Sequence, residues 1–242
     1  PAMIICIDSG NTRIKWGVRD ADVWLAQGAL SHAEIADVGA LLSKWKPSSV
    51  WLSNVAGANA LAGICQALMP WQTLIREVKS SAGGHGVRNG YENPAQLGVD
   101  RWCALIGARG MTAAACLVVM AGTATTIDTL DASGQFHGGL ILPGPDLMRR
   151  ALARDTAALP LASGEHAVCP RNTDDAIISG CLEAQLGAIE RAFTRIAGEP
   201  DAVCLLSGGA AYMLAPQLSI PHRLIDNLVL EGLARQGLAQ DS

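Results

Sequence analysis

The stretch "IICIDSGNTRIKWGV" at residues 4–18 decides how this chain is read. A strand-like apolar run at 4–7 leads into the polar turn Asp8-Ser9-Gly10-Asn11-Thr12, and an alternating run at 14–18 follows at once. Two such runs joined by a short Asp/Gly/Asn segment predict a β-hairpin. The tip of this hairpin carries an aspartate and hydroxyl side chains at the end of a buried strand, where polar groups need partners.

The second half of the chain repeats this pattern. A buried strand from Cys116 leads into Gly122-Thr123-Ala124-Thr125-Thr126, and a return strand ends at Asp128. Turns of this kind can present backbone N–H groups to an anion, and an aspartate at the strand end can hold Mg²⁺. Either turn alone also fits an ordinary hairpin. Together, with one opening each half of the chain, they indicate a pair of phosphate-binding hairpins.

The remaining pattern alternates strands and helices, which predicts an α/β fold. We expect further strands at 23–30, 49–55, 73–78, 135–142 and 203–206, and helices at 34–45, 59–69, 99–109, 146–155, 173–196 and 226–235. The polar segment at 79–101 is long and lacks apolar periodicity. A loop of this kind is usually functional or disordered.

Composition narrows the function classes. The net charge is −4 and no basic cluster is visible, which argues against nucleic-acid binding. The longest apolar run, 116–121, is too short to span a bilayer, and no secretion signal precedes the first strand. The seven cysteines include no C-x-x-C pair, and Cys6, Cys116 and Cys204 fall in strand-like runs. Buried free thiols in a reducing cytoplasm are therefore expected.

Six short motifs together resemble one family. They are Asp8-Ser9-Gly10-Asn11-Thr12, Gly98-Val99-Asp100-Arg101, Gly122-Thr123-Ala124-Thr125-Thr126-Ile127-Asp128, Gly138-Gly139-Leu140-Ile141-Leu142-Pro143-Gly144, Thr173-Asp174-Asp175-Ala176-Ile177 and Ser207-Gly208-Gly209. In this order they resemble the acetate and sugar kinase/Hsp70/actin superfamily and, more closely, the type III pantothenate kinases. The resemblance implies two ribonuclease-H-like (actin-like ATPase) domains, at 1–115 and 116–242, with a nucleotide cleft between them. It also implies a homodimer that transfers the γ-phosphoryl group of ATP to pantothenate, the first step toward coenzyme A.

The resemblance also assigns the ATP side of the site. The first phosphate hairpin is Asp8, Ser9, Gly10, Asn11, Thr12, Arg13, Ile14 and Lys15, and Asp8 lies near Mg²⁺, which it holds directly or through water. Thr123 of the second hairpin contacts ATP phosphate. The adenosine-side loop is Ser207, Gly208 and Gly209, which would otherwise read as a strand-to-helix turn.

On the substrate side, Asp100 is the candidate general base, because phosphoryl transfer to an alcohol needs an acceptor for its proton. The alternative is that Asp100 has no catalytic role and is simply an acidic residue stabilised at a helix N-terminus by the helix dipole. Gly98, Val99, Arg101, Tyr91 and Thr173 match the family's pantothenate-contacting positions. Arg101 can instead form a surface ion pair, and Thr173 can serve as a helix N-cap.

One position departs from the family. Many type III enzymes need K⁺ or NH₄⁺, held partly by an aspartate three residues before the threonine of the second hairpin. That position here is Met120, whose neutral thioether is a poor ligand for a hard cation. We therefore expect weak or no dependence on monovalent cations. Two rival functions stay open, a kinase acting on a sugar or short acid and a nucleotide-binding regulator without turnover.

Overall fold

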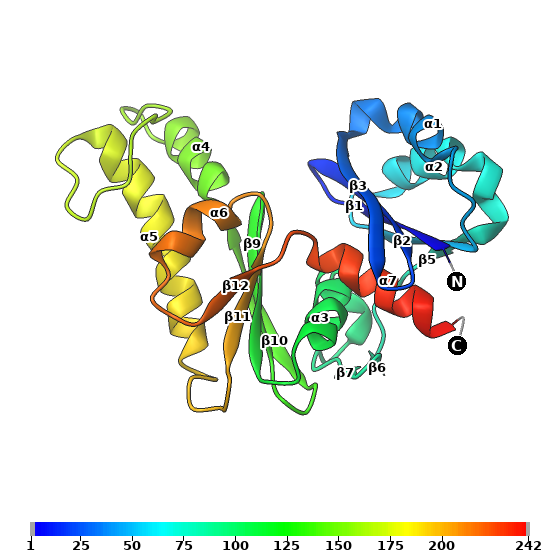
Figure 1. Cartoon of the computed structure of the whole chain (residues 1–242). Helices are drawn as coiled ribbons and strands as arrows, with labels where there is room; N and C mark the ends of the chain where they lie inside the picture. Colours follow the sequence, from blue (N-terminus) through cyan, green and yellow to red (C-terminus); the bar gives the residue numbers. More distant parts are fainter. Residues whose placement is uncertain (1–2, 241–242) are drawn as a thin grey trace. The chain divides into compact units, whose positions relative to one another are not determined.

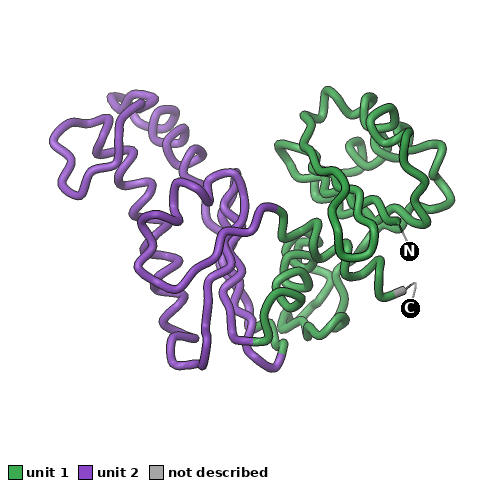
Figure 2. The backbone as a smooth tube through the Cα atoms, in the orientation of Figure 1, with its two compact units in different colours: residues 1–113, 134–136, 227–242 green, residues 114–133, 137–226 purple. Residues whose placement is uncertain are grey.

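The computed structural model describes residues 3–240, and the chain divides into two compact units (Figure 2). The first unit is formed by 1–113, 134–136 and 227–242, and the second by 114–133 and 137–226. The sequence predicts a boundary between two domains at residue 115, and this boundary stays a prediction. The structure adds that two later segments, 134–136 and 227–242, pack with the first unit.

The first unit is built on a five-stranded sheet in the order β3-β2-β1-β4-β5. Its strands are β1 (Met3–Ser9), β2 (Arg13–Asp20), β3 (Val23–Ser31), β4 (Ser49–Asn54) and β5 (Ile75–Glu77). The strands β1, β2 and β3 pair antiparallel, whereas β4 and β5 run parallel to β1. The central strand β1 is buried almost throughout, as expected for a strand covered on both faces.

Helices cover both faces of this sheet (Figure 1). On one face lie a 3₁₀ helix (His32–Asp37), α1 (Val38–Leu42) and α2 (Ala58–Ala67), and their apolar side chains share a core with Ile5 and Ile7. A second 3₁₀ helix, Met69–Leu74, leads from α2 into β5. On the other face lie α3 (Val99–Met111) and the C-terminal α7 (Leu228–Gln240).

The helix α7 packs very closely on α3. A Cβ atom added to Gly232 would lie 1.8 Å from the carbonyl oxygen of Cys103. Glu231 of α7 also reaches the sheet, where its carboxylate accepts hydrogen bonds from Arg19 Nη1 at 2.6 Å and Trp24 Nε1 at 2.7 Å. The last helix of the chain is therefore an integral part of the first unit.

The second unit repeats the topology of the first. Its sheet has the order β10-β9-β8-β11-β12, with β8 (Cys116–Ala121), β9 (Ala124–Leu130), β10 (Phe136–Pro143), β11 (Val203–Ser207) and β12 (His222–Leu224). The helices are α4 (Pro145–Asp155), α5 (Thr173–Phe193) and α6 (Ala211–Leu214), followed by a 3₁₀ helix at Ala215–Gln217. Leu182, Leu186 and Ile189 of α5 share a core with alternate residues of β8 and β11. The matching strand order confirms that the two polar turns are structural repeats.

Most predicted elements are present within a few residues of their expected bounds. The helix expected at 34–45 is instead wound as the 3₁₀ helix His32–Asp37 followed by the short α1. The strand β12 and the helix α6 were not predicted. The long polar segment is ordered by the two-residue strands β6 (Gly83–Gly84) and β7 (Val87–Arg88) and the 3₁₀ helix Pro94–Gln96.

Two further expectations concern burial. Cys6, Cys116 and Cys204 are buried and form no disulfide bond, as the sequence predicted. No helix within residues 3–240 is both long enough and apolar enough to cross a membrane.

Candidate functional site

A buried polar cluster lies at the carboxyl ends of β1 and β4. The parallel pairing of these strands places Asp8 opposite Ser53, and Ser9 opposite Asn54. Asp8 is 8% exposed, and Ser9 and Ser53 are fully buried. Asp8 Oδ1 and Ser9 Oγ nevertheless have no hydrogen-bond partner in the described chain. Buried polar atoms are rarely left unpaired, so the Asp8 carboxylate, the more exposed of the two, is a candidate to bind a ligand.

The electrostatics of Asp8 are unusual. Burial and, to a smaller extent, repulsion from the carboxylate of Asp100 together raise the pKa of Asp8 from the ordinary 3.8 to about 7, while Lys15 and a hydrogen bond from Ser53 partly offset these effects. The two carboxyl groups are thus close enough for their charges to interact. A cation at Asp8 would remove the cost of ionising it.

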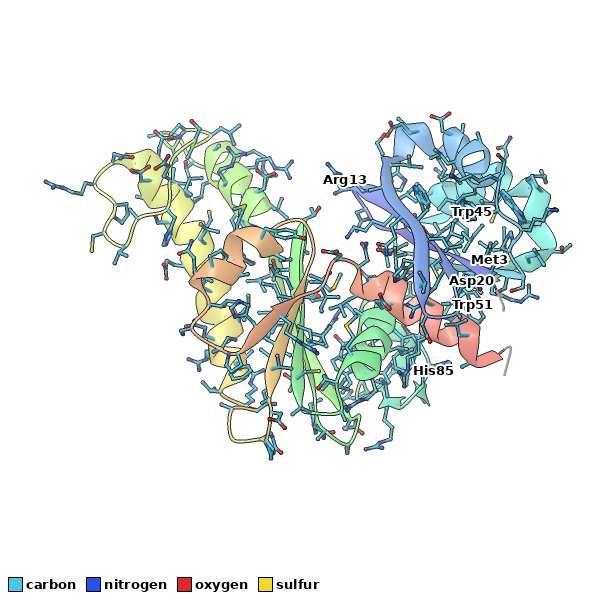
Figure 3. All side chains as sticks on the ribbon, in the orientation of Figure 1. Met3, Arg13, Asp20, Trp45, Trp51 and His85 are labelled. Atoms are coloured by element: carbon cyan, nitrogen blue, oxygen red, sulfur yellow. The ribbon has the colours of Figure 1, made fainter. Side chains whose placement is uncertain are left out.

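The first hairpin has the geometry of a tight polar turn. The Gly10 N–H donates to the Arg13 carbonyl at 3.0 Å, and the Gly10 carbonyl accepts a hydrogen bond from His32 Nε2 at 2.7 Å. Asn11, Thr12 and Arg13 are exposed at the tip. Figure 3 shows Arg13 at this end of the β1–β2 pair, with Met3 and Asp20 at the other end. Thus Asp8 is buried at the base of the turn, while Asn11 and Thr12 face solvent.

The start of α3 explains the run Gly98-Val99-Asp100-Arg101. Asp100 lies half-buried in the first turn of the helix, where an acid interacts favourably with the helix dipole. Its Oδ1 accepts a hydrogen bond from the Arg101 N–H at 2.8 Å. A Cβ atom on Gly98 would lie only 2.7 Å from the same Oδ1. Glycine at position 98 therefore leaves room for the Asp100 carboxylate in this orientation.

Arg101 is not a surface residue. It is 4% exposed, and its Nη1 donates to the Tyr91 hydroxyl at 2.8 Å. Its guanidinium lies 5.5 Å from the centre of the Tyr91 ring and 6.0 Å from that of Phe136. The alternative of a surface ion pair for Arg101 is wrong. Burial against two aromatic rings holds the guanidinium in one place.

Phe136 was missed by the sequence analysis because it belongs to a distant part of the chain. It is fully buried, and its ring centre lies 5.5 Å from that of Tyr91. Residues 134–136 hold the polar loop in place, because the Gly134 carbonyl accepts a hydrogen bond from the Arg88 N–H at 2.8 Å. A Cβ on Gly90 would lie 1.9 Å from the Phe136 carbonyl oxygen, so the loop packs against the start of β10 without space between them. No local sequence pattern indicates such a contact.

In the second unit, the hairpin and the glycine loop share one edge of the sheet. The Gly122 N–H donates to the Ala124 carbonyl at 3.0 Å, and the Gly144 N–H donates to the Thr123 carbonyl at 2.8 Å. Gly208 has a φ of +102°, and a Cβ there would lie 2.3 Å from the Ala121 carbonyl oxygen. Only glycine fits at this position. Nothing lies within 4 Å of a Cβ added to Gly209, so its backbone is open to a ligand.

Thr173 is the first residue of α5 but not its N-cap. That position belongs to Asn172, whose side chain accepts from the Asp175 N–H at 2.9 Å, so the N-cap alternative for Thr173 is wrong. Thr173 lines a cavity of about 710 Å³ between α4 and α5. The cavity walls are mainly apolar and include Met148 and Ile177.

The structure brings the predicted residues into two groups. Asp8 to Lys15, Tyr91 and Gly98 to Arg101 lie in the first unit, and Thr123, Thr173 and Ser207 to Gly209 lie in the second. Sequence analysis missed Ser53, Phe136 and the contact of His32. Ser53 had a usable signal, because a polar pair at the end of an apolar strand repeats the pattern of Asp8-Ser9.

Comparison with known proteins gives a consistent result. The model of the family described as type III pantothenate kinase matches residues 4–195. Two relatives bear the name type III pantothenate kinase. The one from Dechloromonas aromatica is 56% identical over 237 residues, covering 98% of this chain and 99% of the relative. The one from Aromatoleum aromaticum is 58% identical over 233 residues, covering 96% of each.

Solved structures agree on the fold. A structure titled as a conserved putative Baf family transcriptional activator from Campylobacter jejuni has a TM-score of 0.64 and 16% identity, covering 98% of this chain and 100% of the other. Component A of (R)-2-hydroxyglutaryl-CoA dehydratase from Acidaminococcus fermentans has a TM-score of 0.58 and 12% identity, covering 99% of this chain and 97% of the other. At such identities the likeness concerns the fold alone, which is that of the actin-like ATPases. The family match and the high identity along nearly the whole chain lead to one conclusion: the protein belongs to the type III pantothenate kinases.

Proposed function

We propose that this kinase transfers the γ-phosphoryl group of ATP to the primary hydroxyl of pantothenate, giving 4′-phosphopantothenate and ADP at the first step of coenzyme A biosynthesis. The family supports the overall reaction. The observation that carries the chemistry is the pair of interacting carboxyl groups, Asp8 and Asp100, beside the first hairpin. One is buried with an unpaired oxygen, and the other is half-exposed at a helix start.

The residues around Asp8 fit a divalent metal. Kinases of this family use ATP with such a metal, and Mg²⁺ is the one we propose here. Within residues 3–240 no three Asp, Glu, His or Cys side chains gather as a metal cage. Mg²⁺ commonly uses one or two carboxylates and completes its shell with phosphate oxygens and water, so the unpaired Asp8 Oδ1 suffices. When bound, the ion neutralises charge that develops on the phosphate oxygens.

Each unit carries its own set of proposed ATP contacts. In the first unit, residues 8–15 present a turn whose exposed tip holds phosphate through backbone N–H groups and the Thr12 hydroxyl. In the second unit, Thr123 plays the same part, and the open backbone at Gly209 accommodates the adenosine. The shared sheet edge of Thr123 and Ser207 to Gly209 supports this division of roles.

Asp100 is the proposed general base. Its carboxylate accepts the proton of the pantothenate hydroxyl as the oxygen of that hydroxyl forms a bond to the γ-phosphorus and the bond to the leaving ADP breaks. The hydrogen bond from the Arg101 N–H and the absence of a Cβ at Gly98 hold the carboxylate in place. Fixing the base in this way reduces the entropy lost on reaching the transition state.

The proposed pantothenate contacts are Gly98, Val99, Arg101, Tyr91 and Thr173. The Arg101 guanidinium is pre-positioned by Tyr91 and Phe136, and its planar fork suits a carboxylate or amide oxygen of the substrate. Thr173 borders an apolar cavity that would suit an aliphatic portion of a ligand.

Three further properties are proposals of the same kind. We expect the protein to be a homodimer, which light scattering of the purified protein tests. We also expect it to work in the cytoplasm. Met120 is the next-to-last residue of β8, beside the second hairpin, and is partly buried, which supports its expected role as a packing residue without a monovalent cation. The fold likeness to a protein titled a transcriptional activator does not favour a regulator here, since that likeness carries no function at 16% identity.

A coupled assay of ADP release tests the proposal. Wild-type protein with MgATP should turn over with pantothenate and not with a panel of sugars and short acids. Removing the divalent metal with EDTA should stop the reaction. Turnover with a sugar, but not with pantothenate, would favour the rival kinase function. ATP binding without turnover on any acceptor would favour the regulator.

A further inference from the structure

The carbonyl group of Gly10 in the first hairpin is held from outside the hairpin. His32 Nε2 lies 2.7 Å from the Gly10 carbonyl oxygen, 22 residues away in sequence. A carbonyl oxygen can only accept, so this contact requires the proton to be on Nε2. His32 is half-buried.

Local structure explains why His32 is in reach. The strands β2 and β3 pair so that Arg13, at the start of β2, lies opposite Ser31, the last residue of β3. His32 follows directly and opens a 3₁₀ helix. The Glu34 carboxylate accepts hydrogen bonds from the Ser31 N–H at 2.8 Å and the Ser31 hydroxyl at 2.7 Å. This turn therefore fixes the backbone from which the imidazole extends.

The contact determines where the next N–H group points. In a trans peptide the C=O and the following N–H point in opposite directions. Holding the Gly10 carbonyl toward His32 therefore turns the Asn11 N–H away from His32. Glycine tolerates many backbone conformations, so this peptide would flip easily without an external partner. The Asn11 N–H has no hydrogen-bond partner in the described structure and is available to a ligand.

We propose that His32 is a positioning residue that orients the Gly10–Asn11 peptide so that the Asn11 N–H donates to a phosphate oxygen of ATP. This rests on the proposed role of the hairpin in phosphate binding. His32 does not touch the nucleotide itself. A flipped peptide would present a carbonyl oxygen to the phosphate, replacing an attraction by a repulsion.

Three variants of His32 test the proposal. His32→Phe keeps a ring but removes the donor, His32→Ala removes the side chain, and His32→Gln keeps an N–H donor at a similar reach. The kcat and the KM values for ATP and pantothenate would be measured for each, with thermal melting to follow folding. His166→Ala, which removes a histidine that is likewise half-buried and is paired with Glu183 in the second unit, is the matched control.

His32→Phe and His32→Ala are expected to raise the KM for ATP about 3- to 10-fold, the change that corresponds to the net contribution of one hydrogen bond. The KM for pantothenate should stay within about twofold, and His32→Gln should restore the KM for ATP, since both follow from a single lost donor. A role limited to stability would instead lower the melting temperature in all three variants, with the KM for ATP unchanged. If His32→Ala does not fold, the comparison of His32→Phe with His32→Gln still tests the proposal.

Thr12→Ala separates this inference from the proposed function. If Thr12→Ala weakens ATP binding while His32→Phe leaves it unchanged, the inference about His32 is wrong and the hairpin assignment stands. If neither change affects the KM for ATP, the hairpin does not bind phosphate, and both are overturned.

Discussion

Replacing Asp8 by asparagine is expected to stabilise the metal-free protein at alkaline pH and to abolish its kinase activity. The pKa of Asp8 is about 7 in the folded protein because of burial and the nearby Asp100, whereas an unfolded chain has the ordinary 3.8. Between these values the folded state binds more protons than the unfolded state. Stability therefore falls as the pH rises from about 4 to about 7, and the loss is complete above that.

The magnitude follows from the shift. Each pKa unit corresponds to ~1.4 kcal/mol, so a shift of roughly three units costs ~4 kcal/mol at pH 8. Asparagine carries no charge at any pH and avoids this cost. The free energy of unfolding of Asp8→Asn should exceed that of the wild type by under ~1 kcal/mol at pH 4 and by ~4 kcal/mol at pH 8.

Urea denaturation at several pH values between 4 and 8, in EDTA, measures this difference. Asp37→Asn, at an exposed position of the same unit, is the control for the substitution of aspartate by asparagine itself. Asp100→Asn should reduce the trend, because Asp100 contributes to the raised pKa of Asp8. A difference between Asp8→Asn and wild type that stays constant with pH would show that Asp8 ionises normally in the folded protein, and the argument from burial would fail.

The remaining predictions concern the reaction. Asp100→Asn should leave ATP binding, measured by calorimetry, nearly intact and lower kcat by about 10²-fold or more, the usual scale for a positioned general base; unchanged turnover would remove Asp100 from the mechanism. Tyr91→Ala and Thr173→Ala should raise the KM for pantothenate more than that for ATP, and the reverse pattern would show that the proposed division of the site is incorrect. Rates in Na⁺ buffer should rise little when KCl or NH₄Cl is added at matched ionic strength, because Met120 replaces a charged ligand; several-fold activation specific to K⁺ or NH₄⁺ would refute the argument from Met120.

Local patterns in the sequence predicted the parts of the fold that depend on neighbouring residues. The hairpins at Asp8 and Thr123 follow from apolar runs around a polar turn, and the long helix α5 follows from its apolar spacing. Its exact start was less accessible, because Asn172 and Thr173 are both acceptable caps and only the geometry shows that Asn172 accepts from Asp175. Short elements such as β12 are stabilised by pairing with β11, which no local pattern reveals.

In the candidate site, too, some features were predicted from the sequence and others depend on tertiary contacts. Asp8, Asp100 and the glycine loop were identified from motifs that resemble a family. The interaction between Asp8 and Asp100 was not, since it depends on how α3 approaches the end of β1. Arg101 shows this limit: the sequence left a surface ion pair open for it, but Tyr91 and Phe136 enclose it. Phe136 is the first residue of β10, 35 positions further along the chain. Contacts of this range depend on tertiary packing.

The close packing of α7 on α3 has a consequence for the protein during its synthesis. Ribosomes release β1 early, yet the face of the sheet that carries Ile4 and Cys6 is completed only by α7, which is made much later. Domains generally fold as units during translation, so the first unit must wait for α7 to emerge. A nascent chain that stops before Asn227 would expose part of this core to proteases and chaperones. Synthesis through α7 is thus a condition for folding of a unit whose strands are made much earlier.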